Sequence, residues 1–475
     1  MGLGFLLLAC GLFAAIGIWG ARSVRGLEDF FHFRGVGKNV LALVVANITL
    51  GNGIAYLFAA GGALGAVILV LPLALVAGYA LVGWLVSRWA SPALFSGGSL
   101  FAAAAREIGR ATGSRSMLVP MVVGPLALAY LFVLAYELFA SSQIISAFLG
   151  GPANGAPPVL VGALLFVGAL VYTVAGGAQS VYRSDLVQFA AILAFAGIVL
   201  LGAMMAPEVR WVLLPQMPLA MFIITLLALV VNTVATQTFS LLNWYLASNL
   251  EATPQIRTAF LGGAVTTSAF FAVIALVGLG VPGPWGTDLA AALTLLLEPL
   301  RAYGVVADVA FYLVAFGLLS IVLSSADTLM IAVAMFVLEA RQSLRAHQPG
   351  DPSEDISATL FTIRAAIGIG FLVMFAFLGW LYYFRANLFY MLLGIAGGAA
   401  AYAPLVWALL RASRHRLLLE RFTNKRLAIY PVLSLLGLLC AMFLNLRAPE
   451  FVALVPVFSV VISSIFSYKL LMRVG

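Results

Sequence analysis

The sequence has little charge and almost no cysteine or histidine. Only 9% of its 475 residues are charged while 64% are hydrophobic, and the mean hydropathy is +1.12. A soluble domain of this length could not cover its surface with so few polar residues, so the composition excludes that class. The longest polar segment, 341–355, has only the length of a loop. We therefore expect a polytopic membrane protein.

Catalytic and metal-binding groupings are also missing. Cys10 and Cys440 lie in separate apolar runs, and the three histidines are His32, His347 and His415, all in connecting segments. These positions favour neither a disulfide framework nor a His/Cys metal cluster. Since no nucleophile–base spacing and no phosphate-binding glycine loop occurs, we expect no enzymatic activity and no cofactor. We also expect no nucleic-acid partner and no obligate protein partner.

Long apolar runs dominate the chain instead. A membrane-spanning helix needs about 20 apolar residues, and the runs predict an all-α fold of about 13 transmembrane helices. The expected spans are 3–20, 38–61, 64–88, 117–149, 158–177, 185–206, 219–247, 258–280, 305–338, 364–384, 387–410, 428–446 and 451–471. The first run lacks a basic start and a clear cleavage site, so we interpret it as a retained span.

Lysine and arginine indicate the orientation of these spans. If the N-terminus is outside, all but four of the 25 basic residues fall in cytoplasmic segments. Cytoplasmic segments of membrane proteins carry such an excess of positive charge. We therefore expect a multi-pass protein of the plasma (inner) membrane, with its N-terminus outside and its C-terminus in the cytoplasm. The same distribution accounts for the net charge of +8.

Two connecting segments are expected to be helical. The inner segment 99–112 begins at Ser99, a residue suited to an N-cap, and ends just before Gly113. The outer segment 287–300 follows a Pro–Gly–Pro turn at 282–284. Both are predicted to be short helices, the outer one lying along the membrane surface.

The ninth predicted span contains two adjacent hydroxyls and an acid, Ser324, Ser325 and Asp327. Polar groups at membrane depth need partners, because hydrocarbon offers no hydrogen bonds. Together with the carbonyl of Ile321 one turn earlier, these oxygens could satisfy a hard cation such as sodium. Alternatively, both hydroxyls bond back to carbonyls of the preceding turn. A second ion site could include Asp327 and Thr328.

The second predicted span contains both polar residues and glycines. Asn47 and Thr49 precede Gly51, Asn52 and Gly53. Glycine and asparagine weaken a helix, and a broken membrane helix is tolerated where its backbone lines a cavity or binds a ligand. Close helix packing would explain the glycines. Because packing does not explain the three polar residues, we expect a break in this span.

Further polar residues lie inside other predicted spans. Glu137 lies in the fourth, where an acid is unfavourable unless it is paired or neutral. Asp185 begins the sixth span near the inner surface, where a solvated helix N-cap is an alternative interpretation. The seventh span carries a stripe that could line a water-filled pathway. Its polar residues are Asn232, Thr233, Thr236, Gln237, Thr238, Ser240 and Asn243.

Several segments carry a resemblance to a known family. In 172–188, a Tyr–Thr pair is followed by two glycines, an aspartate and a glutamine. The other similar segments are Asp29–Phe31, Ala46–Thr49, Tyr245–Ser248, Ser324–Asp327 and Gly398–Leu405. In this order, over about 29–430, the chain resembles the sodium:solute symporter family.

The resemblance implies a transporter core of two five-helix inverted repeats. The first repeat would span 38–206 and the second 207–411. An extra span and inner loop, 1–37, would precede them, and two peripheral spans, 412–475, would follow. Substrate and ion would lie near the membrane midplane between the repeats.

The resemblance also implies an ion site. The sodium ligands would be the carbonyls of Val45, Ile48 and Ile321 and the hydroxyls of Ser324 and Ser325. Asp185 would belong to the inner route of sodium release. The chain departs from the family in its seventh span, which has no Gly or Pro between Ile223 and Ala252. A break in that span must therefore arise from its polar stripe.

These features predict a secondary active transporter that couples inward movement of sodium to uptake of a small polar solute. We expect Glu137 to select an amine-bearing or cationic solute. Two alternatives stay open: a transporter driven by protons, with Asp185 or Glu137 as the carrier, and a solute-sensing module of the same fold. The candidate solute residues are Asn47, Thr49, Asn52, Glu137, Gln237 and Thr238.

Overall fold

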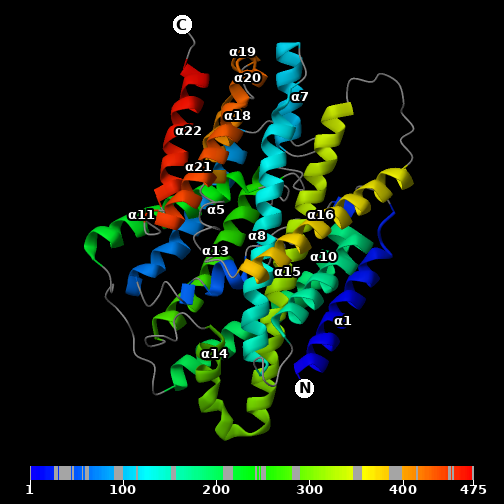
Figure 1. The fold of residues 1–475 in the computed structure, drawn as a ribbon, viewed down its shortest axis with the longest axis vertical. Coiled ribbons are helices and arrows are strands. Elements are labelled where there is room, and N and C mark those ends of the chain that lie inside the picture. Colours follow the sequence, from blue (N-terminus) through cyan, green and yellow to red (C-terminus); the bar gives the residue numbers. More distant parts are fainter. Residues whose placement is uncertain are drawn as a thin grey trace.

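The computed structural model is built from helices (Figure 1). Among the residues it describes there is no strand, which confirms the predicted all-α fold. The described residues are 2–25, 30–31, 44, 48–55, 57–58, 64–89, 100–113, 116–150, 157–206, 218–240, 243–244, 247, 253–280, 289–345, 356–384, 398–412, 416–447, 451 and 454–472.

The helices keep the order expected from the apolar runs. In chain order they are α1 (Gly2–Ala21), η1 (Leu50–Ile54), η2 (Gly65–Leu69), α5 (Val70–Trp89), α7 (Leu100–Thr112), α8 (Leu118–Phe148), α10 (Pro158–Met205), α11 (Leu219–Phe239), α13 (Thr253–Gly280), α14 (Leu289–Leu297), η4 (Glu298–Tyr303), α15 (Val305–Arg345), α16 (Ile356–Phe384), α18 (Tyr402–Ala412), α19 (Arg416–Leu419), α20 (Asn424–Leu427), α21 (Ile429–Arg447) and α22 (Val455–Met472).

Eight helical stretches within the described residues are long and apolar enough to cross a membrane. Large apolar side chains such as Leu8, Met204 and Phe458 are exposed on them, as a lipid environment requires. The chain is thus a multi-pass membrane protein, and the full number of its spans stays a prediction. In Figure 1, α1 begins at the bottom of the molecule and α22 ends at the top.

The segments predicted to be short connecting helices are helical, while their inner and outer placement stays a prediction. The first is α7, and Gly113 directly after it has φ +63°, a left-handed conformation that suits glycine at a helix end. The second is α14, which continues into the 3₁₀ turn η4. Ser99 and the Pro–Gly–Pro turn at 282–284 lie outside the described residues.

The long helix α10 contains two predicted spans joined at Gly177. This residue has φ 51° and ψ −138°, outside the helical region, so the chain changes direction there. The second half begins directly after the joint, at Ala178, seven residues before the predicted start at 185, because helix continues through the polar residues between them. Arg364 of α16 caps the first half: its Nε and one Nη donate to the carbonyls of Val174 and Ala175, each at 3.1 Å.

The helix α1 lies against α10 on the side of this joint (Figure 1). Gly17 and Gly20 allow the approach, since a Cβ on Gly20 would lie 2.7 Å from the Cα of Ser180. The Ser180 hydroxyl donates to the Gly17 carbonyl, and Arg183 lies over the ring of Trp19 with its guanidinium carbon 4.4 Å from the ring centre. α10 also packs against α15, the predicted ion-binding helix.

Candidate ion and solute site

The predicted break in the second span is present. Thr49 has extended backbone, with φ −114° and ψ 146°, and a π-helical turn, η1, starts at Leu50. The Ile54 N–H closes this turn on the Thr49 carbonyl at 2.9 Å. Ile48, directly before the break, is buried. Val45 and Asn47 lie outside the described residues, and so does the side chain of Asn52.

The hydroxyls predicted to bind sodium are buried in α15, which contacts η1. Ser325 Oγ donates to the carbonyls of Ile321 at 3.0 Å and Val322 at 3.1 Å. For this residue, the alternative of a hydrogen bond to the preceding turn of its own helix is therefore present. Its oxygen keeps lone pairs that can still bind a cation. Ser324 Oγ is different, because among the described residues it has no hydrogen-bond partner.

An acidic cluster adjoins these serines between α10 and α15. The Tyr172 hydroxyl donates to Asp327 Oδ2 at 2.5 Å and lies 3.3 Å from the Leu323 carbonyl. Thr328 Oγ1 donates to the other Asp327 oxygen at 3.0 Å. Tyr172, Asp327 and Thr328 are fully buried, and two hydroxyls donate to this carboxyl group.

Asp185 belongs to the same cluster. It lies eight residues after the α10 joint, is completely buried, and interacts electrostatically with Asp327. The solvated N-cap interpretation of Asp185 is therefore wrong. Neither of its carboxyl oxygens has a hydrogen-bond partner among the described residues, and the same is true of Thr173 Oγ1. Two buried acids beside unsatisfied polar groups require a compensating cation or proton.

The seventh span is also interrupted, without help from glycine or proline. Regular helix ends at Phe239, and Ser240 has φ −54° and ψ 115°. Asn243 Nδ2 donates to the backbone carbonyl of Gln237 at 2.8 Å and to its Oε1 at 2.9 Å. Trp244 Nε1 donates to the Thr238 carbonyl at 2.8 Å. Side chains beyond the break thus satisfy the carbonyls that the break frees.

This second break lies beside two tyrosines that the sequence reasoning missed. Tyr130 of α8 lies with its hydroxyl 3.2 Å from Ser240 Oγ. Tyr79 of α5 is fully buried, and its hydroxyl has no hydrogen-bond partner among the described residues. Gln237 packs against Gly78 of the same helix, where a Cβ would lie 2.9 Å from the glutamine Cγ. A single tyrosine in an apolar run gives no sequence signal, because only the fold brings it to a polar neighbour.

Glu137 is brought to the first break. Its Oε1 accepts a hydrogen bond from the Leu50 N–H at 2.6 Å, and the Ser141 hydroxyl lies 3.4 Å from the same oxygen. The structure therefore connects three of the predicted segments: the broken second span touches α8 through Glu137 and also contacts α15.

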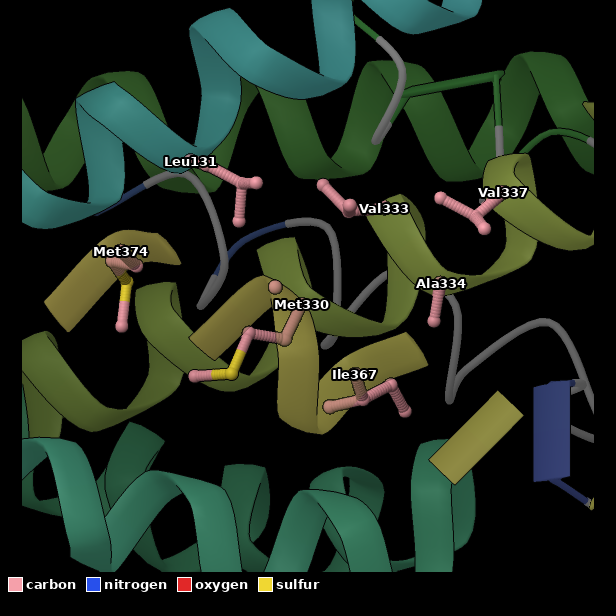
Figure 2. A pocket seen from close by; sticks show the side chains of 8 residues that line it. Leu131, Met330, Val333, Ala334, Val337, Ile367 and Met374 are labelled. Atoms are coloured by element: carbon pink, nitrogen blue, oxygen red, sulfur yellow. The ribbon is translucent and has the colours of Figure 1, made fainter. Parts of the chain in front are cut away.

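A pocket between α8, α15 and α16 is unsuited to a polar solute. Figure 2 shows apolar side chains around it, including Leu131, Met330, Ile367 and Met374. It offers no charged or hydrogen-bonding side chain, which a site for a polar solute requires.

Comparisons with known proteins identify the fold. No protein-family model matches the chain, and no curated protein matches its sequence. Among solved structures, it is similar to a Na+-coupled sialic acid symporter in a substrate-bound outward-open state, described as revealing a novel Na+ site. That match has a TM-score of 0.65 and 12% identity, and it covers 98% of both chains.

Two further solved structures are similar. One is Mhp1, a nucleobase-cation-symport-1 family transporter in a closed conformation with bromovinylhydantoin bound (TM-score 0.56, 14% identity, 94% of this chain and 95% of that one). The other is MhsT in complex with L-phenylalanine (TM-score 0.53, 15% identity, 90% and 99%). At these identities the likeness shows the fold alone, and that fold is one used by secondary transporters.

Proposed function

We propose that the chain is a secondary active transporter that couples inward movement of sodium to uptake of a small polar solute by alternating access. The observation that carries the proposal is the Ser324 hydroxyl, which is buried without a partner among the described residues, on the helix that contacts the broken span. A buried polar group in that condition is unfavourable unless a ligand satisfies it. Further support comes from the transporter fold.

The proposed sodium ligands are five oxygens without a full charge. They are the carbonyls of Val45, Ile48 and Ile321 and the hydroxyls of Ser324 and Ser325. Such a set suits a monovalent ion that must also leave again. We further propose that Asp185, eight residues after the α10 joint, serves the inner release route, and that a second ion could be held by Asp185, Asp327 and Thr328.

The coupling would follow from linkage between the two breaks and the ion. Sodium bound between the broken span and α15 would stabilise the outward-open arrangement and complete the solute site. Shifting a two-state balance from 1:99 to 99:1 requires about 5.5 kcal/mol of differential binding by ion and solute together. The membrane potential adds about 2.3 kcal/mol per charge per 100 mV. We place the repeats at 38–206 and 207–411, in the plasma membrane with the N-terminus outside.

The proposed solute site lies between the two breaks. Its residues would be Asn47, Thr49, Asn52, Glu137, Gln237 and Thr238. The Asn243 amide donates a hydrogen bond to the Gln237 side chain, so a solute at this position would contact both side chains. Glu137 would favour an amine-bearing or cationic solute if its charge faces the site.

Sodium-dependent stabilisation tests the proposal without knowledge of the solute. The purified chain would be heated in sodium chloride and in choline chloride, alone and with amino acids, sugars, ureides or carboxylates. We expect sodium to raise the melting temperature of the wild type. In Ser324→Ala, about tenfold more sodium should be needed for the same effect, since losing one ligand group removes on the order of 1 kcal/mol. A wild type that sodium does not stabilise would contradict sodium coupling.

Proton coupling is the second candidate, favoured by the buried pair Asp185 and Asp327. If a proton and not sodium compensates these acids, proteoliposomes should accumulate solute under an inward pH gradient in choline buffer. Uptake that needs sodium at every pH gradient would exclude this alternative. Asp327→Asn is the informative variant, because it removes the second acid at similar size and keeps one of the two acceptor oxygens that Tyr172 and Thr328 use.

A further inference from the structure

Glu137 connects α8 to the broken second span. It lies in the middle of α8 with no exposed surface. Its Oε1 accepts a bond from the Leu50 N–H at 2.6 Å, and Ser141, one turn along α8, places its hydroxyl 3.4 Å from the same oxygen. The contact joins two segments that are 87 residues apart in sequence.

The Leu50 amide needs such an acceptor. Leu50 begins the turn η1, and amides in a first helical turn have no carbonyl partner within their own helix. The extended residue before it, Thr49, makes no side-chain cap. A backbone N–H buried in a membrane protein must be satisfied from elsewhere, and the Glu137 oxygen does this.

The bond fixes a whole peptide group. The peptide between Thr49 and Leu50 is planar, so the direction of its N–H sets the direction of its C=O. The N–H is bound by Glu137, and the C=O accepts from the Ile54 N–H at 2.9 Å. With both ends held, the Thr49–Leu50 peptide has one orientation relative to α8, and the extended Thr49 (φ −114°, ψ 146°) relates the Ile48 carbonyl to it.

We propose that Glu137 is a positioning residue that anchors the outer half of the broken span to α8 and thereby sets the Ile48 carbonyl and Thr49 for ion and solute binding. The ligand roles of Ile48 and Thr49 rest on the proposed function, while the anchor itself does not. The anchor requires an acceptor oxygen at the end of a side chain of this length. Recognition of a cationic solute would instead require the negative charge.

Four variants of the full chain separate these requirements. Glu137→Gln keeps an acceptor oxygen and loses the charge. Glu137→Asp keeps the charge but withdraws the oxygen from Leu50, and Glu137→Met removes both at similar size. Gln143→Met is the matched control, since Gln143 is an exposed polar residue on the same helix.

Hydrogen–deuterium exchange of the peptide 48–55, in choline chloride, measures the anchor directly. We expect the wild type, Glu137→Gln and Gln143→Met to exchange slowly, and Glu137→Met and Glu137→Asp at least about tenfold faster. Slow exchange in Glu137→Met would overturn the proposal. Exchange in Glu137→Gln as fast as in Glu137→Met would also overturn it, because charge would then be the requirement. If Glu137→Met does not fold, Glu137→Asp decides the question.

Repeating the exchange in sodium chloride tests the link to ion binding. We expect sodium to protect 48–55 and 321–325 in the wild type, with about tenfold more sodium needed in Glu137→Asp. A wild type without sodium protection would contradict the proposed function while leaving the choline result to decide the anchor. Equal sodium requirements in the wild type and in a fast-exchanging Glu137→Asp would show that the anchor does not position the ion ligands, and would overturn that part of the proposal.

Discussion

Replacing Gly177 by alanine should destabilise the protein through two effects that the structure separates. The first is conformational: φ 51° with ψ −138° is a region that residues with a Cβ avoid, at about 1–3 kcal/mol. The second is steric, because a Cβ at this position would lie 2.3 Å from the Phe30 carbonyl oxygen and 2.8 Å from the Phe30 ring. Forcing such an overlap costs about 1–3 kcal/mol. The expected sum is about 2–6 kcal/mol.

Two other glycines provide controls for these terms. Gly113 has φ +63°, but a Cβ added to it would meet nothing within 4 Å, so Gly113→Ala measures conformational strain alone, about 1 kcal/mol. Gly197 lies in the second half of α10, where an added Cβ would also meet nothing within 4 Å. Gly197→Ala should therefore be neutral or stabilising by up to about 1 kcal/mol.

Thermal unfolding in detergent measures all three variants. We expect Gly177→Ala to melt about 2–6 °C below the wild type, with Gly113→Ala between the two. Since Tyr172 and Asp185 lie on either side of the joint, the variant should also lose sodium-dependent stabilisation. If Gly177→Ala were as stable as Gly197→Ala, the joint and its contact with Phe30 would be refuted.

Three further predictions concern the neighbourhood of the joint. Ser325→Ala should raise the sodium concentration for half-maximal uptake into proteoliposomes by about tenfold, and an unchanged sodium dependence would remove this hydroxyl from the ligand set. Tyr172→Phe removes the hydroxyl that donates to Asp327 Oδ2, so the free energy of unfolding in a denaturant titration should fall by about 1–3 kcal/mol. An unchanged free energy of unfolding would contradict this hydrogen bond. Arg364→Leu should lower stability by about 1 kcal/mol, since the side chain is exposed, and Arg364→Lys should recover part of this loss in the same titration.

Sequence reasoning identified the elements that depend on local pattern. The apolar runs predicted the long helices, Ser99 and Gly113 predicted α7, and the Pro–Gly–Pro turn at 282–284 predicted α14. It placed the start of the sixth span too late, because the polar residues after Gly177 were interpreted as a loop. Those residues are helical, and Asp185 among them is completely buried. Polarity marks a loop in water, whereas between packed membrane helices it marks a buried site.

The two broken spans differ in how far the local sequence pattern predicts the break. Asn47, Gly51, Asn52 and Gly53 weaken helix formation in the second span, so its break was predicted from neighbouring residues. The seventh span has no glycine or proline, and its break depends on Asn243 and the tryptophan after it, which bond to carbonyls six residues earlier. Those side chains were visible as a polar stripe, but their bonding partners were not.

Each break is stabilised by hydrogen bonds other than the backbone bonds of a regular helix. At the second span the group is Glu137, which belongs to another helix, so the backbone conformation there depends on how α8 is placed. At the seventh span the groups are local, apart from Tyr130 of the same α8, which lies beside Ser240. Because α8 contacts both breaks, a movement of the broken spans relative to α8 would change the Leu50 and Ser240 contacts together. A double variant, Glu137→Met with Tyr130→Phe, should therefore differ in sodium-dependent stabilisation from the sum of the single variants by more than about 0.5 kcal/mol. Strict additivity would show that the two breaks act independently.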